Sequence, residues 1–90
     1  MKIDFDPEKN QKNIAERSIS FEIAYLFDFS TAVVDTDIRH DYGETRKIAT
    51  GFIAGRLFVM VFKPIDGGIR VISLRKANPR EKRKYESQKN

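Results

Sequence analysis

The sequence predicts an α+β fold, in which an antiparallel β-sheet meander carries two N-terminal helices and one C-terminal basic helix. Three observations lead to this prediction. Helix-start signals occur near residues 6, 20 and 78. Apolar, strand-like segments follow one another between residues 46 and 76. Short turn sequences join those segments, which favours antiparallel neighbours. The expected order of elements is β-α-α-β-β-β-β-α.

The N-terminal part predicts one strand and two helices. Residues 2–6 alternate charged and apolar side chains, which is typical of a short edge strand. Asp6 is a candidate N-cap and Pro7 a first helical residue, so a surface helix is expected to run to about Arg17. Ser20 opens a second expected helix, whose apolar stripe should pack on the sheet.

The middle of the chain predicts three strands and a polar loop. Residues 32–34 form the first of these strands, and residues 35–44 form the loop. Residues 46–53 form the second, and Gly55-Arg56 is the expected turn. Residues 56–63 form the third, whose continuous apolar centre predicts a central strand buried on both faces.

The last third predicts a hairpin, a strand and a helix. Asp66-Gly67-Gly68 is a strong hairpin signal, and residues 68–76 form the strand that follows it. Asn78 is expected to cap the final helix. All helices are expected to cover one face of the sheet. Regular alternation along the strand puts Arg70, Ile72, Leu74 and Lys76 on one face, and Ile69, Val71, Ser73 and Arg75 on the other.

Composition limits the function classes. Ninety residues predict one domain over residues 1–90. The chain has 17 Lys and Arg against 13 Asp and Glu, and an isoelectric point near 9.5 favours an acidic partner such as nucleic acid, an anionic membrane or an acidic protein. The absence of cysteine excludes disulfides and zinc–thiolate sites. No signal peptide is visible, so a cytoplasmic location is expected.

The positive charge is concentrated at one end, where residues 75–90 hold seven Lys or Arg and two acids. A fixed cluster of arginines suits bidentate phosphate binding, and Tyr85 could stack on a base or transfer a proton. The alternative is that these cations only solvate an exposed helix that Tyr85 anchors to the sheet. Asp35, Asp37 and Asp41 could hold a hard cation, but a solvated acidic loop is favoured, so no metal site is expected.

Residues 70–86, from Arg70-Val71-Ile72-Ser73 to Arg80-Glu81 and Tyr85-Glu86, resemble the C-terminal signature of the BrnT-type toxins. The opening Phe5-Asp6-Pro7, the central Glu44-Thr45-Arg46 and residues 59–62 match the same family, so the resemblance covers nearly the whole chain. It implies a RelE-like fold and a type II toxin, a ribonuclease that works without metal or cofactor, cleaves RNA and inhibits translation.

The resemblance also implies partners and candidate site residues. The partner would be a BrnA-like ribbon-helix-helix antitoxin. The two proteins would form a heterotetramer that binds operator DNA through the antitoxin and represses its own operon. Within this reading, we expect catalytic roles for Arg46, Arg75, Arg80, Tyr85 and Glu44, and RNA contacts from Arg70, Lys76, Arg83, Lys84 and Arg17.

One segment departs from the family pattern. Where the family has Lys-His-Gly after the first helix, this chain has Glu16-Arg17-Ser18. The histidine, a candidate proton-transfer group, is replaced by Arg17, and Ser18 replaces a glycine suited to a left-handed helix end. The alternative function is therefore a non-catalytic or weakened homologue, acting as an interaction protein in an operator-binding complex.

Overall fold

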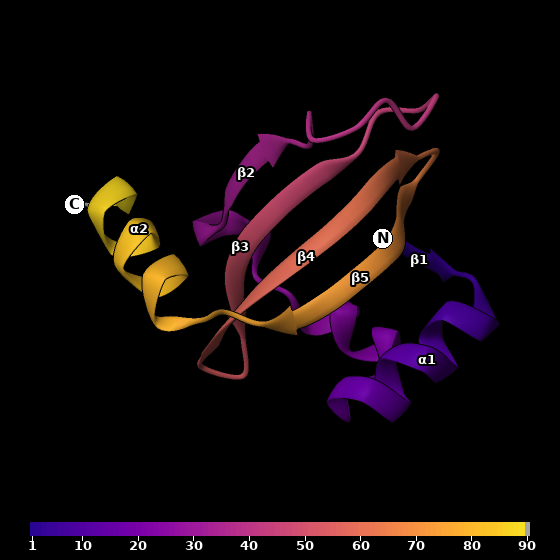
Figure 1. Cartoon of the computed structure of the whole chain (residues 1–90), viewed down its shortest axis with the longest axis horizontal. Helices are drawn as coiled ribbons and strands as arrows, with labels where there is room; N and C mark the ends of the chain where they lie inside the picture. The colour runs from indigo at the N-terminus through magenta and orange to yellow at the C-terminus, as the bar shows by residue number, and fades with distance from the viewer. Residues whose placement is uncertain (90) are drawn as a thin grey trace.

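The computed structural model describes residues 1–89 and contains a five-stranded sheet in the order β1-β5-β4-β3-β2 (Figure 1). The four strands β2 to β5 form the predicted antiparallel meander, and β1 pairs in parallel with β5 at one edge. The sheet is therefore mixed, and the α+β prediction is confirmed. The strands are β1 (Lys2–Phe5), β2 (Val33–Thr36), β3 (Lys47–Ile53), β4 (Arg56–Ile65) and β5 (Gly68–Lys76).

The first helix, α1 (Pro7–Arg17), begins and ends where its local signals predict. The Asp6 carboxylate accepts a hydrogen bond from the Glu8 N–H at 2.9 Å, as an N-cap does. Ser18 ends the helix in the left-handed region, with φ 58°. Most of the helix is exposed, as predicted, and its two buried residues, Asn10 and Asn13, are polar. The helix is therefore attached to the fold by hydrogen bonds.

The prediction of a second α-helix is wrong, because the chain forms two short 3₁₀ helices instead. These are η1 (Phe21–Leu26) and η2 (Phe29–Thr31). Asp28 divides them: its N–H donates to the Phe52 carbonyl of β3 at 2.9 Å, and its carboxylate accepts from the Ser30 N–H at 3.0 Å. A side chain that caps a new turn competes with continued helix, so the first one stops.

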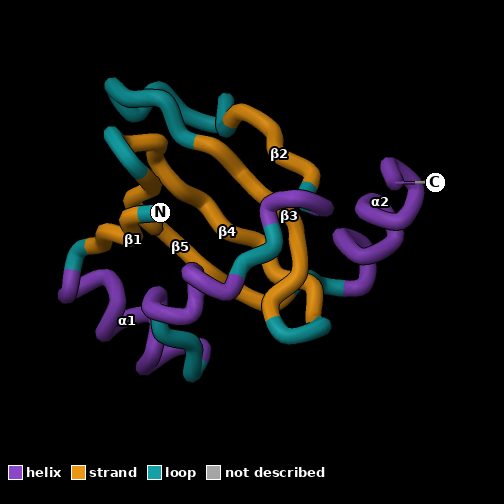
Figure 2. The backbone as a smooth tube through the Cα atoms, turned by 180° about the vertical axis from the view of Figure 1, so that it is seen from behind, coloured by secondary structure: helices purple, strands orange, loops and turns teal. Residues whose placement is uncertain are grey.

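The main core lies between these short helices and one face of the sheet, which we call the inner face. Figure 2 shows η1 and η2 crossing in front of the strands on this side. Gly51 allows close contact there, because a Cβ atom at this position would lie 2.7 Å from the ring of Phe27. The buried members of this core include Phe21, Ala24, Phe27, Ala49, Ile53, Met60, Phe62, Val71 and Leu74.

The C-terminal helix, α2 (Pro79–Lys89), packs on the opposite face of the sheet, so the prediction that all helices cover one face is wrong. Its Tyr85 lies in a second buried cluster with Leu57, Val59 and Ala77. Figure 1 shows α2 at one end of the sheet and α1 at the other. Because α2 covers only one end, much of this second face, the groove face, remains free of helix.

β4 lies in the middle of the sheet, and its residues from Leu57 to Phe62 are all buried, as the apolar run predicts. The turn before it is formed by Ala54 and Gly55, both at positive φ, one residue earlier than expected. After β4, Asp66 and Gly67 make the expected hairpin turn. Among residues 1–89, no helix has the length and apolar character needed to cross a membrane.

A β-bulge in β5 changes which residues share a face. Val61 pairs with Ser73 while the next residue, Phe62, pairs with Val71, so Ile72 is an extra residue in the ladder. Leu74 therefore joins Val71 in the core, and the predicted strict alternation is wrong beyond residue 71. After the bulge, Ser73 and Arg75 lie on the groove face.

Candidate functional site

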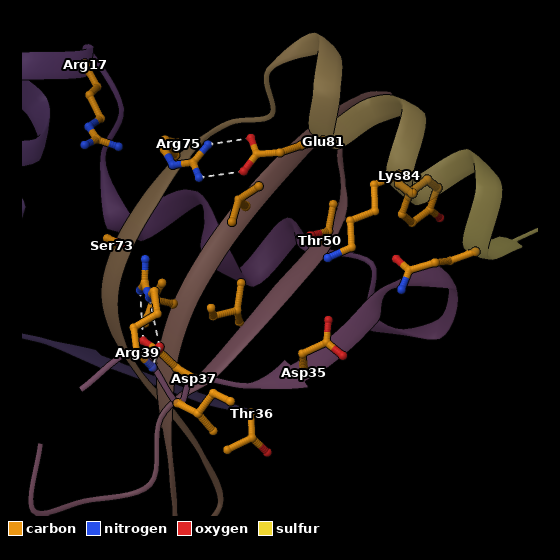
Figure 3. Close-up of a pocket in the computed structure, with 16 residues that line it drawn as sticks. Arg17, Asp35, Thr36, Asp37, Arg39, Thr50, Ser73, Arg75, Glu81 and Lys84 are labelled. Carbon is orange, nitrogen blue, oxygen red and sulfur yellow. Dashed lines mark hydrogen bonds and ion pairs between the residues drawn. The ribbon is translucent and has the colours of Figure 1, made fainter. Parts of the chain in front are cut away.

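A groove of about 600 Å³ occupies the groove face between α2, the end of α1 and the loop that follows β2 (Figure 3). Its floor is formed by side chains of three neighbouring strands, with Val59 and Val61 of β4 in the middle. Seven charged residues line it: the cations Arg17, Arg39, Arg75 and Lys84, and the acids Asp35, Asp37 and Glu81. The four positive and three negative side chains leave the groove with a net charge of only about +1. How it would bind a ligand therefore depends on how these side chains are paired and oriented.

Arg75 is held by a bidentate ion pair. Its two terminal nitrogens donate to the two carboxylate oxygens of Glu81, each at 2.7 Å. Glu81 also accepts from the Asn78 N–H at 2.9 Å, while the Asn78 side chain accepts from the Glu81 N–H at 2.8 Å. This reciprocal capping confirms Asn78 as the N-cap and fixes Glu81 at the start of α2. The guanidinium therefore has one defined orientation.

The same contact shifts the pKa values of both partners. Hydrogen bonding to Arg75 lowers the pKa of Glu81, although partial burial opposes the effect. Hydrogen bonding to Glu81 raises the pKa of Arg75, and the nearby charge of Arg39 acts in the opposite direction. Glu81 is therefore a carboxylate that stays ionised, and it is poorly suited to accept a proton during a reaction.

A second bidentate pair joins Arg39 to Asp37 on the loop beside the groove. The Nε and Nη2 of Arg39 each donate to one oxygen of Asp37 at 2.9 Å. The side chain of Asp37 is fully buried, while that of Arg39 is 62% exposed. These hydrogen bonds hold the pKa of Asp37 far below its usual value. The expectation that Asp37 is a solvated acid is therefore wrong.

Three groove side chains have no ion-pair partner among residues 1–89. These are Arg17 at the end of α1, Lys84 of α2 and Asp35 of β2. Arg17 is the residue that replaces the expected histidine, and its neighbour Glu16 pairs with Lys12 at 3.9 Å. Two cations and one carboxylate are thus available to a ligand.

Tyr85 lines the groove but is itself only 7% exposed. Its hydroxyl donates to the Thr31 carbonyl at 2.7 Å, and its ring meets Phe52 edge to face at 5.6 Å. The ring contact attaches α2 to β3 of the sheet, and the hydroxyl attaches it to η2. The anchoring alternative considered for this residue therefore has direct geometric support.

Two predicted site residues lie together, away from the groove. Arg46 donates to Glu44 at 3.1 Å and stacks on Tyr42, 3.9 Å from the ring centroid, while Lys63 approaches the same carboxylate at 3.8 Å. Val59 lies opposite Arg75, and Lys63 is four residues further along β4. This cluster is therefore displaced from Arg75 by roughly 13 Å along the strand direction.

The remaining predicted residues are spread over other surfaces. Arg70 pairs with Asp4 of β1 at 2.6 Å. Lys76 lines a smaller cavity of about 310 Å³ between α2 and the start of β4, together with Arg56 and Lys82. Arg80 and Arg83 are exposed on α2 and line neither cavity. Of the ten predicted residues, the groove brings together Arg17, Arg75, Lys84 and Tyr85.

Sequence reasoning missed the roles of Arg39, Asp37 and Asp35 in this groove. An Asp-x-Arg spacing is a usable signal, because the loop can turn a guanidinium back onto a carboxylate two residues earlier. Within residues 1–89, no group of three or more His, Cys, Asp or Glu side chains is arranged to hold a metal ion.

Comparison with known proteins adds one match. Residues 5–81 match the model of a family described as the ribonuclease toxin, BrnT, of type II toxin-antitoxin systems. No curated protein is significantly similar to the chain. The matched range includes Arg17, Arg39, Arg75 and Glu81, and it ends before Lys84 and Tyr85.

Proposed function

This chain belongs to the BrnT family of ribonuclease toxins of type II toxin-antitoxin systems, and from that premise we propose that its groove binds and cleaves RNA. The observation that carries the proposal is the Arg75–Glu81 pair at 2.7 Å, beside two cations without ion-pair partners. An arginine held in a fixed orientation suits bidentate contact with a phosphate. The charge of Arg17 and Lys84 would attract the RNA backbone.

The proposed reaction is metal-independent transesterification. The ribose 2′-oxygen attacks the adjacent phosphorus, the P–O5′ bond breaks, and the products carry a 2′,3′-cyclic phosphate and a 5′-hydroxyl. The 2′-OH proton passes to a base, and the leaving 5′-oxygen receives a proton. Negative charge accumulates on the non-bridging phosphate oxygens in the transition state, where a preorganised guanidinium stabilises it.

Asp35 is the candidate general base that we favour over Glu44. The groove holds three carboxylates, and two of them, Asp37 and Glu81, are each bound to an arginine. Asp35 has no ion pair among residues 1–89, whereas Glu44 contacts Arg46 and Lys63 outside the groove. A carboxylate within reach of a substrate proton and free of a bidentate partner suits general-base catalysis.

The other predicted residues would act at a distance from the reacting phosphate. Arg46, Arg70, Lys76, Arg80 and Arg83 lie outside the groove, where they could contact more distant phosphates of a longer RNA. Such contacts strengthen binding and its dependence on salt without taking part in the chemistry. We propose that Tyr85 positions α2, since its hydroxyl is already bound to Thr31.

The test combines expression in cells with cleavage in solution. Expression of the chain alone should arrest growth and fragment RNA. The purified protein should cleave RNA in the presence of EDTA, leave cyclic phosphate ends, and fail on a substrate with a 2′-deoxyribose at the cleaved position. Arg75→Ala should lose both effects, whereas Arg56→Ala, at the start of β4 and outside the groove, should keep them.

As a type II toxin family, BrnT implies an antitoxin partner. We propose a BrnA-like ribbon-helix-helix antitoxin, whose acidic segment covers the groove in a heterotetramer that represses its operon at operator DNA. The nearly balanced groove charge and the Glu16-Arg17-Ser18 segment leave one competing function, a non-catalytic interaction protein. Normal growth with intact RNA, at verified soluble expression, would favour that competitor, and Arg17→His would then test the segment.

A further inference from the structure

Arg39 lies in the groove because hydrogen bonds of Asp37 hold the loop that follows β2 in one conformation. The backbone N–H of Asp37 donates to the Arg46 carbonyl at 2.8 Å, which closes the base of the loop. The buried carboxylate of Asp37 also accepts from the Arg39 N–H at 3.1 Å, in addition to the two side-chain bonds. Two hydrogen bonds from the guanidinium and one from the backbone of Arg39 to a single carboxylate leave the guanidinium little freedom, although most of the side chain is exposed.

Both groove arginines keep unused donors. An arginine has five N–H donors. Asp37 accepts the Nε–H and one Nη2–H of Arg39, so both Nη1 hydrogens and one on Nη2 have no hydrogen-bond acceptor among residues 1–89. Glu81 accepts one hydrogen from each terminal nitrogen of Arg75, and the Lys76 carbonyl accepts from Nη1 at 3.5 Å, so the Nε–H and one Nη2 hydrogen have no acceptor among residues 1–89. Figure 3 shows the two guanidinium groups held by their carboxylates on either side of Ser73.

We propose that Arg39 and Arg75 together bind one RNA phosphodiester, an arrangement that we call the phosphate clamp. Asp37 and Glu81 are its positioning residues. The inference rests on the proposed function of the groove and identifies the part of the substrate that it recognises. A phosphodiester presents two non-bridging oxygens, and each arginine offers donors to one of them.

The paired carboxylates explain how two guanidinium groups can face the same groove. Two like charges near one another repel, and each carboxylate compensates its own arginine. The carboxylates also fix side chains that would otherwise lose rotamer freedom on binding. A phosphate that enters therefore meets donors already in place, and the charge on each arginine is retained.

The test is binding of a short RNA with 2′-O-methyl riboses, which cannot undergo transesterification, measured by fluorescence anisotropy. Arg39→Lys keeps the charge but loses the fork, so affinity should fall roughly tenfold. Arg56→Lys is the matched control and should bind within about twofold of the unchanged protein. Asp37→Asn should weaken binding to a similar extent, and the double variant Asp37→Asn/Arg39→Lys should be no weaker than Arg39→Lys.

Several outcomes would overturn the clamp. Arg39→Lys binding like the unchanged protein would show that only charge matters. Additive losses in the double variant would show that Asp37 does not act through Arg39. If Asp37→Asn fails to fold, Arg39→Lys alone still decides, because its side chain is mostly exposed. Unchanged protein that binds no RNA overturns the clamp, whereas binding with this pattern and no cleavage of ordinary RNA overturns only the proposed nuclease activity.

Discussion

Asn13 of α1 donates a hydrogen bond of 2.9 Å to the carbonyl oxygen of Leu74, which lies 61 positions later in the sequence. The same amide nitrogen donates to the Ile19 carbonyl at 2.9 Å. Asn13 lies one helical turn before Arg17, and Leu74 comes directly before Arg75. One buried amide therefore connects the backbone segments that carry Arg17 and Arg75, two of the three arginines that line the groove.

Asn13→Ala should destabilise the fold by about 1–3 kcal/mol, because the carbonyls of Ile19 and Leu74 would lose a buried donor. Urea unfolding measures the difference. Gln11→Ala, an exposed change in the same helix, serves as the control and should stay within about 0.5 kcal/mol. A loss for Asn13→Ala no larger than that of the control would mean that the amide does not hold α1 to the strand.

Gly68→Ala should detach the edge strand β1. A Cβ atom at this position would overlap the backbone of Lys2, whose carbonyl lies directly against Gly68 in the parallel ladder. The two backbones must separate, at a cost of about 3 kcal/mol, the upper end of the range for overpacking. Hydrogen exchange of the β1 amides should speed up first. Asp66→Asn, which preserves the turn chemistry, should leave these amides protected.

The Arg75–Glu81 pair should contribute to stability only above acidic pH. Bonding to Arg75 lowers the pKa of Glu81 from its ordinary value of 4.5, so the stabilisation is complete above that value. It is then lost as pH falls through the lower folded-state pKa. The difference in unfolding free energy between the unchanged protein and Glu81→Gln should therefore be constant from about pH 5 to about pH 7. It should shrink as the pH falls below 4.5.

Glu86→Gln provides the matched comparison for that measurement. Glu86 lies on the same helix, is exposed, and has no ion pair among residues 1–89. Its variant should differ from the unchanged protein by no more than about 0.5 kcal/mol. A Glu81→Gln difference that stays the same from about pH 7 to below pH 4.5 would contradict the role assigned to the pair.

Tyr85→Phe separates anchoring from catalysis. Loss of the hydroxyl removes the bond to Thr31 and should lower stability by about 0.5–1.5 kcal/mol, with RNA cleavage nearly unchanged at temperatures well below unfolding. A catalytic proton donor or acceptor would instead lose roughly 100-fold or more in rate. Single-turnover cleavage measures the rate, and thermal unfolding measures the stability. A large loss of rate without destabilisation would restore the catalytic assignment of Tyr85.

Local signals were readable from the sequence because their physics is local. Asp6 and Asn78 cap helices through bonds to residues two or three positions away, and Asp66-Gly67 turns a hairpin through its own backbone preferences. The continuous apolar run of β4 predicted its burial for a similar reason. Asp28 shows the limit, since its backbone N–H also bonds to the Phe52 carbonyl of β3, a partner that is distant in sequence and that no local signal indicates.

The candidate site was less predictable because it depends on pairing between elements. The extra residue Ile72 decides that Leu74 turns inward, and no alternation rule anticipates a bulge. Charge alone favoured Arg80 and Arg83, which the fold leaves on the outer surface of α2. Arg39 lies outside the basic C-terminal segment, and only the loop geometry brings it to the groove.

The parallel pairing of β1 with β5 has a consequence for synthesis on the ribosome. Lys2 pairs with Gly68, so the first strand to be made has no partner in this sheet until 66 further residues have followed. At about 5–20 residues per second, that delay is roughly 3–13 seconds. Arg75 is made later still, and the carboxylate that orients it comes six residues after that. The groove of the nascent chain therefore lacks part of its lining until most of α2 has been translated.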